Sequence, residues 1–392
     1  MLSNSWIGGI TVIVVVGNAG AAPTTLQRLE LVPGSSSSSQ NIMGVSADGS
    51  TVVGWSGNRA AVWRSDGTGR FLSSFPGEIG SQANAVNSDG SIIVGISATS
   101  TGHRACMWTN GVGRLLPVIG VATQSQCWAV SEDGRAAAGH VTSATTGSTR
   151  FAARWAEGVG GGYANSVAPT GGWTSEAWAM NSAGTVIAGE QSGRAFRWIA
   201  GLGTQLLPDG GQLGGDRVWG MNSSGTVLVG QAGFAMARWV GDSEPEILAD
   251  QYSGIYAYSC SADGNVIVGG RSGSAEAAII WTPGTGVVLL RELLQARGFD
   301  VGLIDLGSGV GVTADGRTFV GASSLSAGRG FILHLGDCPA DMNADLIVDF
   351  FDYLDYVQAF AVGDVAADRD GDGVVDLCDY LDFLEAFSVG CE

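Results

Sequence analysis

The sequence predicts a mainly β protein: a seven-bladed β-propeller followed by a small α-helical domain with paired calcium loops. Three observations lead to this prediction. Glycine makes up 63 of the 392 residues, a share that suits a turn-rich β protein better than a helical bundle. One short pattern occurs seven times between residues 44 and 321. Residues 337–392 hold 15 of the 37 acidic residues and contain a second repeat, which indicates a separate domain.

The first pattern is a small residue, an apolar residue, Ser, Asn or Thr, one variable residue, Asp or a small residue, Gly, four mostly apolar residues and a final Gly. An Asp-Gly pair between two apolar runs is a strong signal for a β-hairpin, because Gly tolerates the positive φ of the turn. Each copy therefore predicts one hairpin. The copies lie at 44–54, 85–95, 129–139, 179–189, 220–230, 259–269 and 311–321.

Two more strands are expected in each unit. The third strand carries an Ala-x-x-Trp motif, as at 60–63 and 105–108, although the seventh copy ends in Leu333. A more variable apolar run, such as 69–72, supplies the fourth strand. Four strands in units of 39–52 residues are typical of propeller blades.

The two ends of the repeat region together supply the strands of one blade. The seventh unit has no fourth strand before the acidic tail, whereas a spare apolar strand at 26–34 precedes the first hairpin. Because a ring of blades has to close, we predict that residues 22–336 form seven blades and that both chain ends contribute to the last one.

These repeats resemble those of the bacterial extracellular family named for its His-Ala-Phe motif, whose units share the Ser-x-Asp-Gly-x-x-x-x-Gly and Ala-x-x-Trp patterns. The resemblance covers about residues 26–335; the triplet itself does not occur, and Arg-Ala-Phe at 194–196 is nearest to it. The resemblance implies a secreted, propeller-like module and assigns no activity.

The N-terminus predicts export. An apolar run at 6–16 is followed by Ala-Gly-Ala at 19–21, so residues 1–21 are interpreted as a secretory signal peptide, with a buried N-terminal strand as the alternative. No later segment is long and apolar enough to span a membrane. We therefore expect a secreted protein, extracellular or at the cell surface, and six cysteines fit that compartment.

Charge excludes one class of partner. All 19 basic residues are Arg, and the net charge is −18. Nucleic-acid binding needs a basic footprint, so no nucleic-acid partner is expected.

The repeated Asp and Trp residues are interpreted as turn and core residues, because a residue needed in every unit supports the fold. Aromatic residues outside the repeat are the better binding candidates, although core packing competes with that role. No catalytic Ser/His/Asp or metal-ligand spacing involves the three histidines. Isolated acids could converge as a glycosidase pair. The aromatic candidates are Trp55, Trp128, Trp173, Trp178 and Trp219, and the acids are Glu176, Glu190 and Asp216.

Residues 341–352 and 368–379 are two copies of one twelve-residue loop. Oxygen donors occupy positions 1, 3, 5, 9 and 12, and the backbone carbonyl at position 7 completes the EF-hand-type spacing. Hard oxygen donors alone favour Ca²⁺. The predicted ligands are Asp341, Asn343, Asp345, Ile347, Asp349 and Asp352 in the first loop, and Asp368, Asp370, Asp372, Val374, Asp376 and Asp379 in the second.

The second calcium site is expected to be the tighter one. It has Gly373 at position 6, where the chain turns sharply, whereas the first loop has Leu346 there. A short helix should follow each loop, at 353–360 and 380–387. The expected apolar stripes are Leu354, Val357 and Phe360 in one helix and Leu381, Leu384 and Phe387 in the other.

Two loop-helix units in so small a domain resemble a type I dockerin. The resemblance implies a cohesin-like or other surface protein as partner, and Cys338 and Cys391 would clasp the two ends. Positions 10 and 11 depart from the clostridial Ser/Thr pair: they are Phe350 and Phe351 in the first loop and Leu377 and Cys378 in the second. Whether the two Phe are core or an exposed partner surface stays open.

The sequence thus predicts a secreted, non-catalytic binding or scaffold propeller, tethered through a calcium-dependent dockerin-like module. Two alternatives remain open. One is a polysaccharide-degrading glycosidase or lyase that carries a dockerin, and the other is a lectin-like propeller that binds a polysaccharide through its unrepeated Trp residues.

Overall fold

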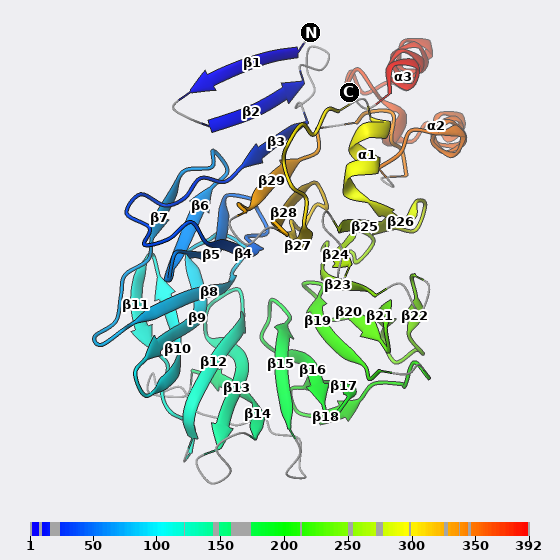
Figure 1. The fold of residues 1–392 in the computed structure, drawn as a ribbon. Coiled ribbons are helices and arrows are strands. Elements are labelled where there is room, and N and C mark those ends of the chain that lie inside the picture. Colours follow the sequence, from blue (N-terminus) through cyan, green and yellow to red (C-terminus); the bar gives the residue numbers. More distant parts are fainter. Residues whose placement is uncertain are drawn as a thin grey trace.

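Seven β-sheets are arranged in a ring around a central axis in the computed structural model (Figure 1). The structure describes residues 2–7 and 10–15 as backbone, and 24–120, 122–143, 149–157, 174–211, 214–249, 254–271, 277–297, 299–324, 328–336, 338–343 and 346–390 in full, except for the side chain of residue 389. Each sheet is one blade, so the predicted seven-bladed β-propeller is confirmed.

The blades follow one another along the chain, and the first strand of each is the innermost. Blade 1 contains β4 (Gln40–Val45), β5 (Thr51–Ser56), β6 (Arg59–Arg64) and β7 (Gly69–Phe71). Blade 2 contains β8 (Gly80–Val86), β9 (Ile92–Thr99), β10 (Gly102–Thr109) and β11 (Val112–Leu115). Blade 3 contains β12 (Ala122–Val130), β13 (Ala136–Ser143) and β14 (Arg150–Ala156), after which 158–173 lie outside the described residues.

The next three blades repeat this order. Blade 4 contains β15 (Ser175–Met180), β16 (Val186–Gln191), β17 (Arg194–Ile199) and β18 (Gly203–Leu206). Blade 5 contains β19 (Arg217–Met221), β20 (Val227–Ala232), β21 (Ala235–Val240) and β22 (Glu246–Ile247). Blade 6 contains β23 (Ile255–Cys260), β24 (Ile267–Arg271), β25 (Ala278–Thr282) and β26 (Gly286–Leu289).

Blade 7 joins the two ends of the propeller, as predicted. It contains β27 (Ser308–Val312), β28 (Thr318–Ala322) and β29 (Phe331–His334), and β3 (Thr25–Arg28) pairs antiparallel with β29 as the fourth strand. Leu26 lies opposite Leu333 and is fully buried. A hairpin of β1 (Leu2–Ile7) and β2 (Ile10–Val15) extends this sheet beyond β3, in the segment interpreted as a signal peptide; the cleavage region at 16–23 lies outside the described residues.

The Asp-Gly turns form as predicted. All seven turn glycines have φ between +66° and +78°, a region that L side chains rarely adopt. Asp133 shows the role of the turn acid: its Oδ1 accepts from Ser131 Oγ (2.8 Å) and from the Arg135 N–H (2.9 Å). Burial opposes ionisation, but these hydrogen bonds prevail and lower the pKa of Asp133. The repeated acids therefore hold turns.

The repeated Trp residues pack between neighbouring blades. Trp63, Trp108, Trp155 and Trp239 are fully buried, and burying each stabilises the fold by at most about 4–6 kcal/mol before entropy is counted. Each indole N–H also donates to a backbone carbonyl 31–38 residues earlier in the chain, for example Trp108 to Ser73 at 2.9 Å. These Trp residues belong to the core, as predicted.

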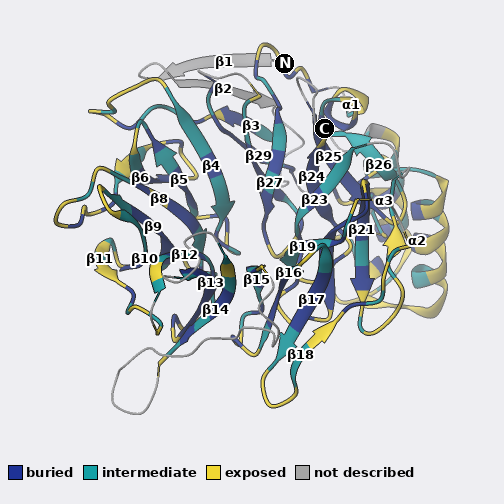
Figure 2. Ribbon diagram, turned by 60° about the horizontal axis from the view of Figure 1, so that its bottom comes forward, coloured by how far each residue is buried: buried dark blue, intermediate teal, exposed yellow. Residues whose placement is uncertain are grey.

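An element that the repeats do not predict lies between blades 6 and 7. Helix α1 (Leu290–Ala296) buries Leu290, Leu293 and Leu294 in a cluster shared with Leu26 and Phe331. Figure 2 shows the buried residues concentrated within the blades, whereas the C-terminal helices carry many exposed residues.

The C-terminal unit contains α2 (Phe350–Val362), the 3₁₀ turn η1 (Val365–Ala367) and α3 (Leu377–Val389). Tyr356 and Phe383 occupy equivalent positions of the two loop-helix units, and their rings stack with centroids 3.8 Å apart and planes 1° apart. The Tyr353 and Tyr380 hydroxyls, also equivalent, lie 3.1 Å apart. The internal repeat is therefore a local two-fold pseudo-symmetry. Within the described residues, no helix is long and apolar enough to cross a bilayer.

Candidate functional site

Every inner strand carries one β-bulge at the same repeat position. The register with the second strand shifts by one residue there, so one extra residue per blade is pushed out of the ladder. It is the residue immediately before each hairpin signature. The seven residues, which we call the channel ring, are Met43, Asn84, Trp128, Trp178, Trp219, Tyr258 and Val310.

The last Gly of the signature permits the bulge. A Cβ at Gly139 would collide with the carbonyl oxygen of Gln126, and Gly95 stands in the same relation to Gln82. Only a residue without a side chain lets the inner strand approach so closely. The signature glycine therefore places the channel-ring residue beside it.

The channel ring surrounds a cavity of about 430 Å³ at the centre of the propeller, within the roughly 300–1,000 Å³ typical of small-molecule sites. All seven ring residues line it, together with Asn41, Ile42, Ser308 and Ala322. Among these described lining residues, none carries a carboxylate, an imidazole or a thiol. The cavity is aromatic and neutral.

Aromatic side chains from consecutive blades contact one another along one side of the cavity. The centroids of Trp178 and Trp219 lie 6.5 Å apart, and those of Trp219 and Tyr258 lie 5.5 Å apart. Tyr256 approaches Trp219 edge-on at 5.6 Å. We call Trp128, Trp178, Trp219 and Tyr258 the aromatic arc. Three of these are binding candidates named from the sequence; Tyr258 was missed, although its place before the sixth signature would have identified it.

Two polar atoms in the channel ring lack a hydrogen-bond partner among the described residues: Nε1 of Trp128 and Oδ1 of Asn84. The Asn84 amide is oriented by its Nδ2, which donates to the carbonyl of Cys127 at 2.8 Å. Asn84 therefore lies beside the backbone that carries Trp128, and the two unpartnered atoms belong to residues that line the cavity. Buried polar atoms without partners are rare in native proteins and need an explanation.

The residues two positions before each bulge form a second ring, which we call the channel mouth: Asn41, Gln82, Gln126, Glu176, Arg217, Tyr256 and Ser308. All are polar or phenolic. The two charged members are compensated, because Arg150 Nη1 lies 2.6 Å from Glu176 Oε1 and Arg217 Nε lies 2.8 Å from Glu190 Oε2.

The candidate acids converge only in part. Glu176 and Glu190 are cross-strand partners at the mouth, but each is paired with an arginine. Asp216 is buried and accepts from the backbone N–H groups of Gly210 and Gly233 at 3.2 and 3.1 Å. Burial raises the pKa of Asp216 despite these hydrogen bonds.

Each of the three histidines lies beside another polar side chain of the propeller. His103 Nδ1 lies 2.9 Å from Gln126 Nε2, and His334 Nδ1 lies 3.0 Å from Thr318 Oγ1. His140 is buried with Nδ1 3.4 Å from a Glu176 oxygen. That carboxylate would favour the charged ring, but burial dominates and, with the charges of Arg150 and His103, lowers the pKa of His140 to about 4.

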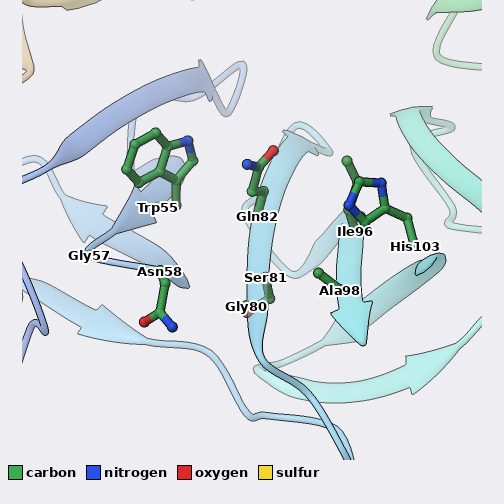
Figure 3. A pocket seen from close by; sticks show the side chains of 9 residues that line it. All are labelled: Trp55, Gly57, Asn58, Gly80, Ser81, Gln82, Ile96, Ala98 and His103. Carbon is green, nitrogen blue, oxygen red and sulfur yellow. The ribbon is translucent and has the colours of Figure 1, made fainter. Parts of the chain in front are cut away.

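A second hollow of about 260 Å³ adjoins the mouth between blades 1 and 2. Trp55 and His103 stand on opposite sides of it, with Gln82 between them (Figure 3). Trp55 is also the cross-strand partner of Asn41, which lines the central cavity. We call it the Trp55 hollow. The last aromatic candidate, Trp173, lies outside the described residues.

The second acidic loop gathers its carboxylates. Oxygens of Asp368, Asp370 and Asp372 all lie within 4.8 Å of one another. Asp379 is buried, and its Oδ1 accepts from the Arg369 and Asp370 N–H groups at 2.6 and 3.2 Å. Positions 1, 3 and 5 thus converge and position 12 is bonded to the start of the loop, an arrangement that fits a hard cation.

The first loop has the same backbone bonding. Asp352 Oδ1 accepts from the Met342 and Asn343 N–H groups at 2.8 and 3.3 Å. Asp345 lies outside the described residues. In both loops the acids at positions 9 and 12 form a capping box that begins the following helix, Asp349 with Asp352 and Asp376 with Asp379. This capping role, which the spacing alone did not indicate, starts both helices earlier than predicted.

Leu346 adopts the left-handed conformation that position 6 requires, with φ +73°, beside +85° for Gly373. Its side chain is 8% exposed and belongs to the propeller cluster that contains Leu290 and Phe299. The strained residue therefore also packs against the propeller.

The predicted apolar stripes are correct only at Phe360 and Phe387, which pack in the core between the helices. Leu354, Val357 and Leu381 are exposed. The rest of the aromatic core comes from neighbouring positions, where ring stacking is possible: Tyr353, Tyr356, Tyr380 and Phe383. Phe350 and Phe351 are 63% and 65% exposed, so they are surface residues. We call Phe350, Phe351, Leu354, Leu377 and Leu381 the tail face.

Four of the six cysteines are free thiols: Cys106, Cys127, Cys260 and Cys378. Burial raises the pKa of Cys127 to about 12. Cys338 is disulfide-bonded; Cys391, its predicted partner, lies outside the described residues.

These features define a seven-bladed β-propeller with an aromatic central cavity and a C-terminal helical unit with acidic loops. No protein-family model matches the chain, and no curated protein sequence matches it. Among solved structures the chain is similar to hydrazine synthase of Kuenenia stuttgartiensis, at 13% identity and a TM-score of 0.45, over 77% of this chain and 98% of that chain. A similarity this weak carries no argument about function.

Proposed function

We propose that this protein is a secreted, non-catalytic binding propeller, held to a partner by a calcium-dependent C-terminal module. One observation carries the binding role: seven bulges, one per blade, place side chains around a central cavity dominated by the aromatic arc. An aromatic cavity with few oriented polar atoms suits ligand binding. Its described lining carries no carboxylate, imidazole or thiol.

Calcium is the cation that the acidic loops would hold. The three converging carboxylates of Asp368, Asp370 and Asp372 repel one another without a cation. Bound Ca²⁺ would neutralise them and favour the folded loop, since binding energy becomes folding energy in small metal domains. The ligands would be the six residues of each loop named from the sequence, and the second loop, with Gly373, should bind more tightly.

The tail face supports the tether. Its five residues are exposed on α2 and α3, and four of them form equivalent pairs in the two units, Phe350 with Leu377 and Leu354 with Leu381. Exposed apolar groups of this size on a strongly acidic module indicate a partner with an apolar groove and a basic rim. A cohesin-like surface protein is the partner that the dockerin resemblance implies, and the disulfide of Cys338 is in keeping with export.

A polysaccharide-degrading enzyme is the second candidate, because Glu176 and Glu190 face each other at the mouth. Glycosidases need two carboxyl groups with separate roles, one of them a proton donor. Both groups already form an ion pair with an arginine. These ion pairs favour a structural role for the two acids.

A combined binding and turnover screen tests the proposal. The full-length protein, loaded with Ca²⁺, is screened for ligand-induced thermal stabilisation against a soluble ligand library, and for product release from polysaccharides. We expect stabilisation that Trp219→Ala removes, with no turnover. The matched control, Trp198→Ala, alters a Trp of an outer strand and should keep the response. Turnover that Glu176→Gln abolishes would establish the enzyme instead.

A further inference from the structure

The two orphaned atoms of the channel ring are complementary in kind. Nε1 of Trp128 is a donor, and Oδ1 of Asn84 is an acceptor. Asn84 is 5% exposed, so its oxygen is removed from bulk water. A hydroxyl group both donates and accepts, so hydroxyl groups of a ligand are suited to pair with a donor and an acceptor of this kind.

The aromatic arc indicates the shape of the ligand that carries such hydroxyl groups. Trp178, Trp219 and Tyr258 form a contiguous wall with centroid separations of 6.5 and 5.5 Å, whereas the opposite side of the cavity is formed by Met43 and Val310. A ligand that matches needs one flat apolar face for the wall and hydroxyls at its edge. A bridging water would satisfy the polar atoms but leave the aromatic faces without a partner.

The charges of the cavity and its mouth narrow the class of ligand further. The described lining of the cavity is uncharged, and Glu176 and Arg217 at the mouth are already paired with Arg150 and Glu190. A charged ligand would enter without a counter-charge and lose its hydration. The site therefore selects neutral ligands.

The hollow beside the mouth indicates a chain longer than one ring. Asn41 lines the cavity, and its cross-strand partner Trp55 lines the Trp55 hollow with Gln82 and His103. The hollow, shown in Figure 3, offers a second aromatic surface flanked by amides. A linear ligand that leaves the cavity past Asn41 would reach Trp55.

We propose that the channel binds a neutral oligosaccharide. One sugar ring stacks on the aromatic arc with its hydroxyls paired to Trp128 Nε1 and Asn84 Oδ1, and the chain continues over Trp55. The proposal rests on the binding role proposed above and names the class of its ligand.

Calorimetric titration of the full-length, calcium-loaded protein tests it, with cellohexaose, xylohexaose, mannohexaose and chitohexaose as neutral probes and hexagalacturonate as the charged one. At least one neutral hexasaccharide should bind and hexagalacturonate should not. Trp128→Phe keeps an aromatic ring but removes the N–H donor together with the five-membered ring of the indole, so it should weaken binding roughly five- to tenfold. The control Trp198→Phe should change it less than twofold, and Trp55→Ala should weaken the hexasaccharide but not the corresponding disaccharide.

Equal affinity of the parent and Trp128→Phe would overturn the proposed hydrogen bond between the sugar and Trp128. Preferential binding of hexagalacturonate would overturn the assignment of a neutral ligand. A parallel titration with the uncharged apolar probe N-phenyl-1-naphthylamine separates the proposed binding role from the proposed sugar ligand. If the probe binds in a manner that Trp219→Ala abolishes while no sugar binds, the carbohydrate assignment fails and the binding role stands. If neither binds, both fail.

Discussion

The backbone carbonyl of Leu346 accepts a hydrogen bond from Nε of Arg297 at 3.0 Å, which joins the first acidic loop to the propeller just after α1. Leu346 also buries its side chain in the cluster around Leu290 and Leu293. Its left-handed backbone costs roughly 1–2 kcal/mol, and burying a leucine contributes about 1.5–3 kcal/mol. Packing between the two parts therefore offsets the strain of the loop.

This balance predicts an order among substitutions at Leu346. Leu346→Ala loses the packing and keeps the strain, whereas Leu346→Gly loses the packing and relieves the strain. The Gly variant should therefore be the more stable of the two by about 1 kcal/mol, and the parent should be at least as stable as either. Chemical denaturation of the full chain in Ca²⁺, followed at the C-terminal unit, measures the order. An Ala variant as stable as the parent would show that the contact contributes nothing.

The two calcium loops should differ in affinity. Asp368→Ala removes a carboxylate from the converged set of the second loop, so it should abolish the tighter of two binding steps, whereas Asp341→Ala should affect the weaker one. Asp355→Asn, on α2 outside both loops, is the control for loss of charge. Calcium titration by calorimetry decides the matter, and two equal steps in the parent would contradict the assignment.

Ring closure predicts that the N-terminal strand β3 contributes to global stability. Leu26→Ala should destabilise the propeller by about 2–5 kcal/mol, because the side chain is fully buried against the last strand. Leu202→Ala, at a site 71% exposed, should change stability by less than about 0.5 kcal/mol. Deletion of 22–34 should lower the melting temperature further. Melting of the deletion variant at the parent's temperature would contradict the closure.

His140 predicts a defined pH dependence. Its pKa falls from 6.5 in the unfolded chain to about 4 in the folded protein, so between these values the unfolded state binds the extra proton. Stability should therefore decrease by about 3 kcal/mol at most as the pH falls from 6.5 to 4. His140→Gln should flatten the unfolding free energy over this window, and His103→Gln should not. An unchanged slope in His140→Gln would show that another group is responsible.

Three features could be predicted, because each depends on a local pattern. Asp-Gly turns predict the hairpins, the Ala-x-x-Trp motif predicts the repeated Trp residues, and the spare N-terminal strand predicts the shared last blade. The channel ring could be predicted only in part. Trp128, Trp178 and Trp219 stood out as unrepeated aromatics, but the bulge that directs them inward arises from contact between strands, at glycines such as Gly139.

Other features depend on packing that no local pattern describes. Helix spacing alone placed the tail core at Leu354 and Leu381, whereas the two-fold stacking of Tyr356 on Phe383 selects a neighbouring stripe. Leu346 was recognisable as a strained residue, but its contact with the propeller depends on the position of α1, an element outside the repeats.

The central claim is that the channel ring binds ligand while the repeated Trp residues only build the core. The most direct measurement is the set of indole N–H resonances in the ¹⁵N-tryptophan-labelled protein, recorded while the hexasaccharide that binds in calorimetry is titrated. The account predicts that the signals of Trp128, Trp178 and Trp219 shift with saturation, while those of Trp63 and Trp239 stay in place. Shifts confined to Trp63 and Trp239, or unchanged signals of all three channel residues at saturation, would contradict it.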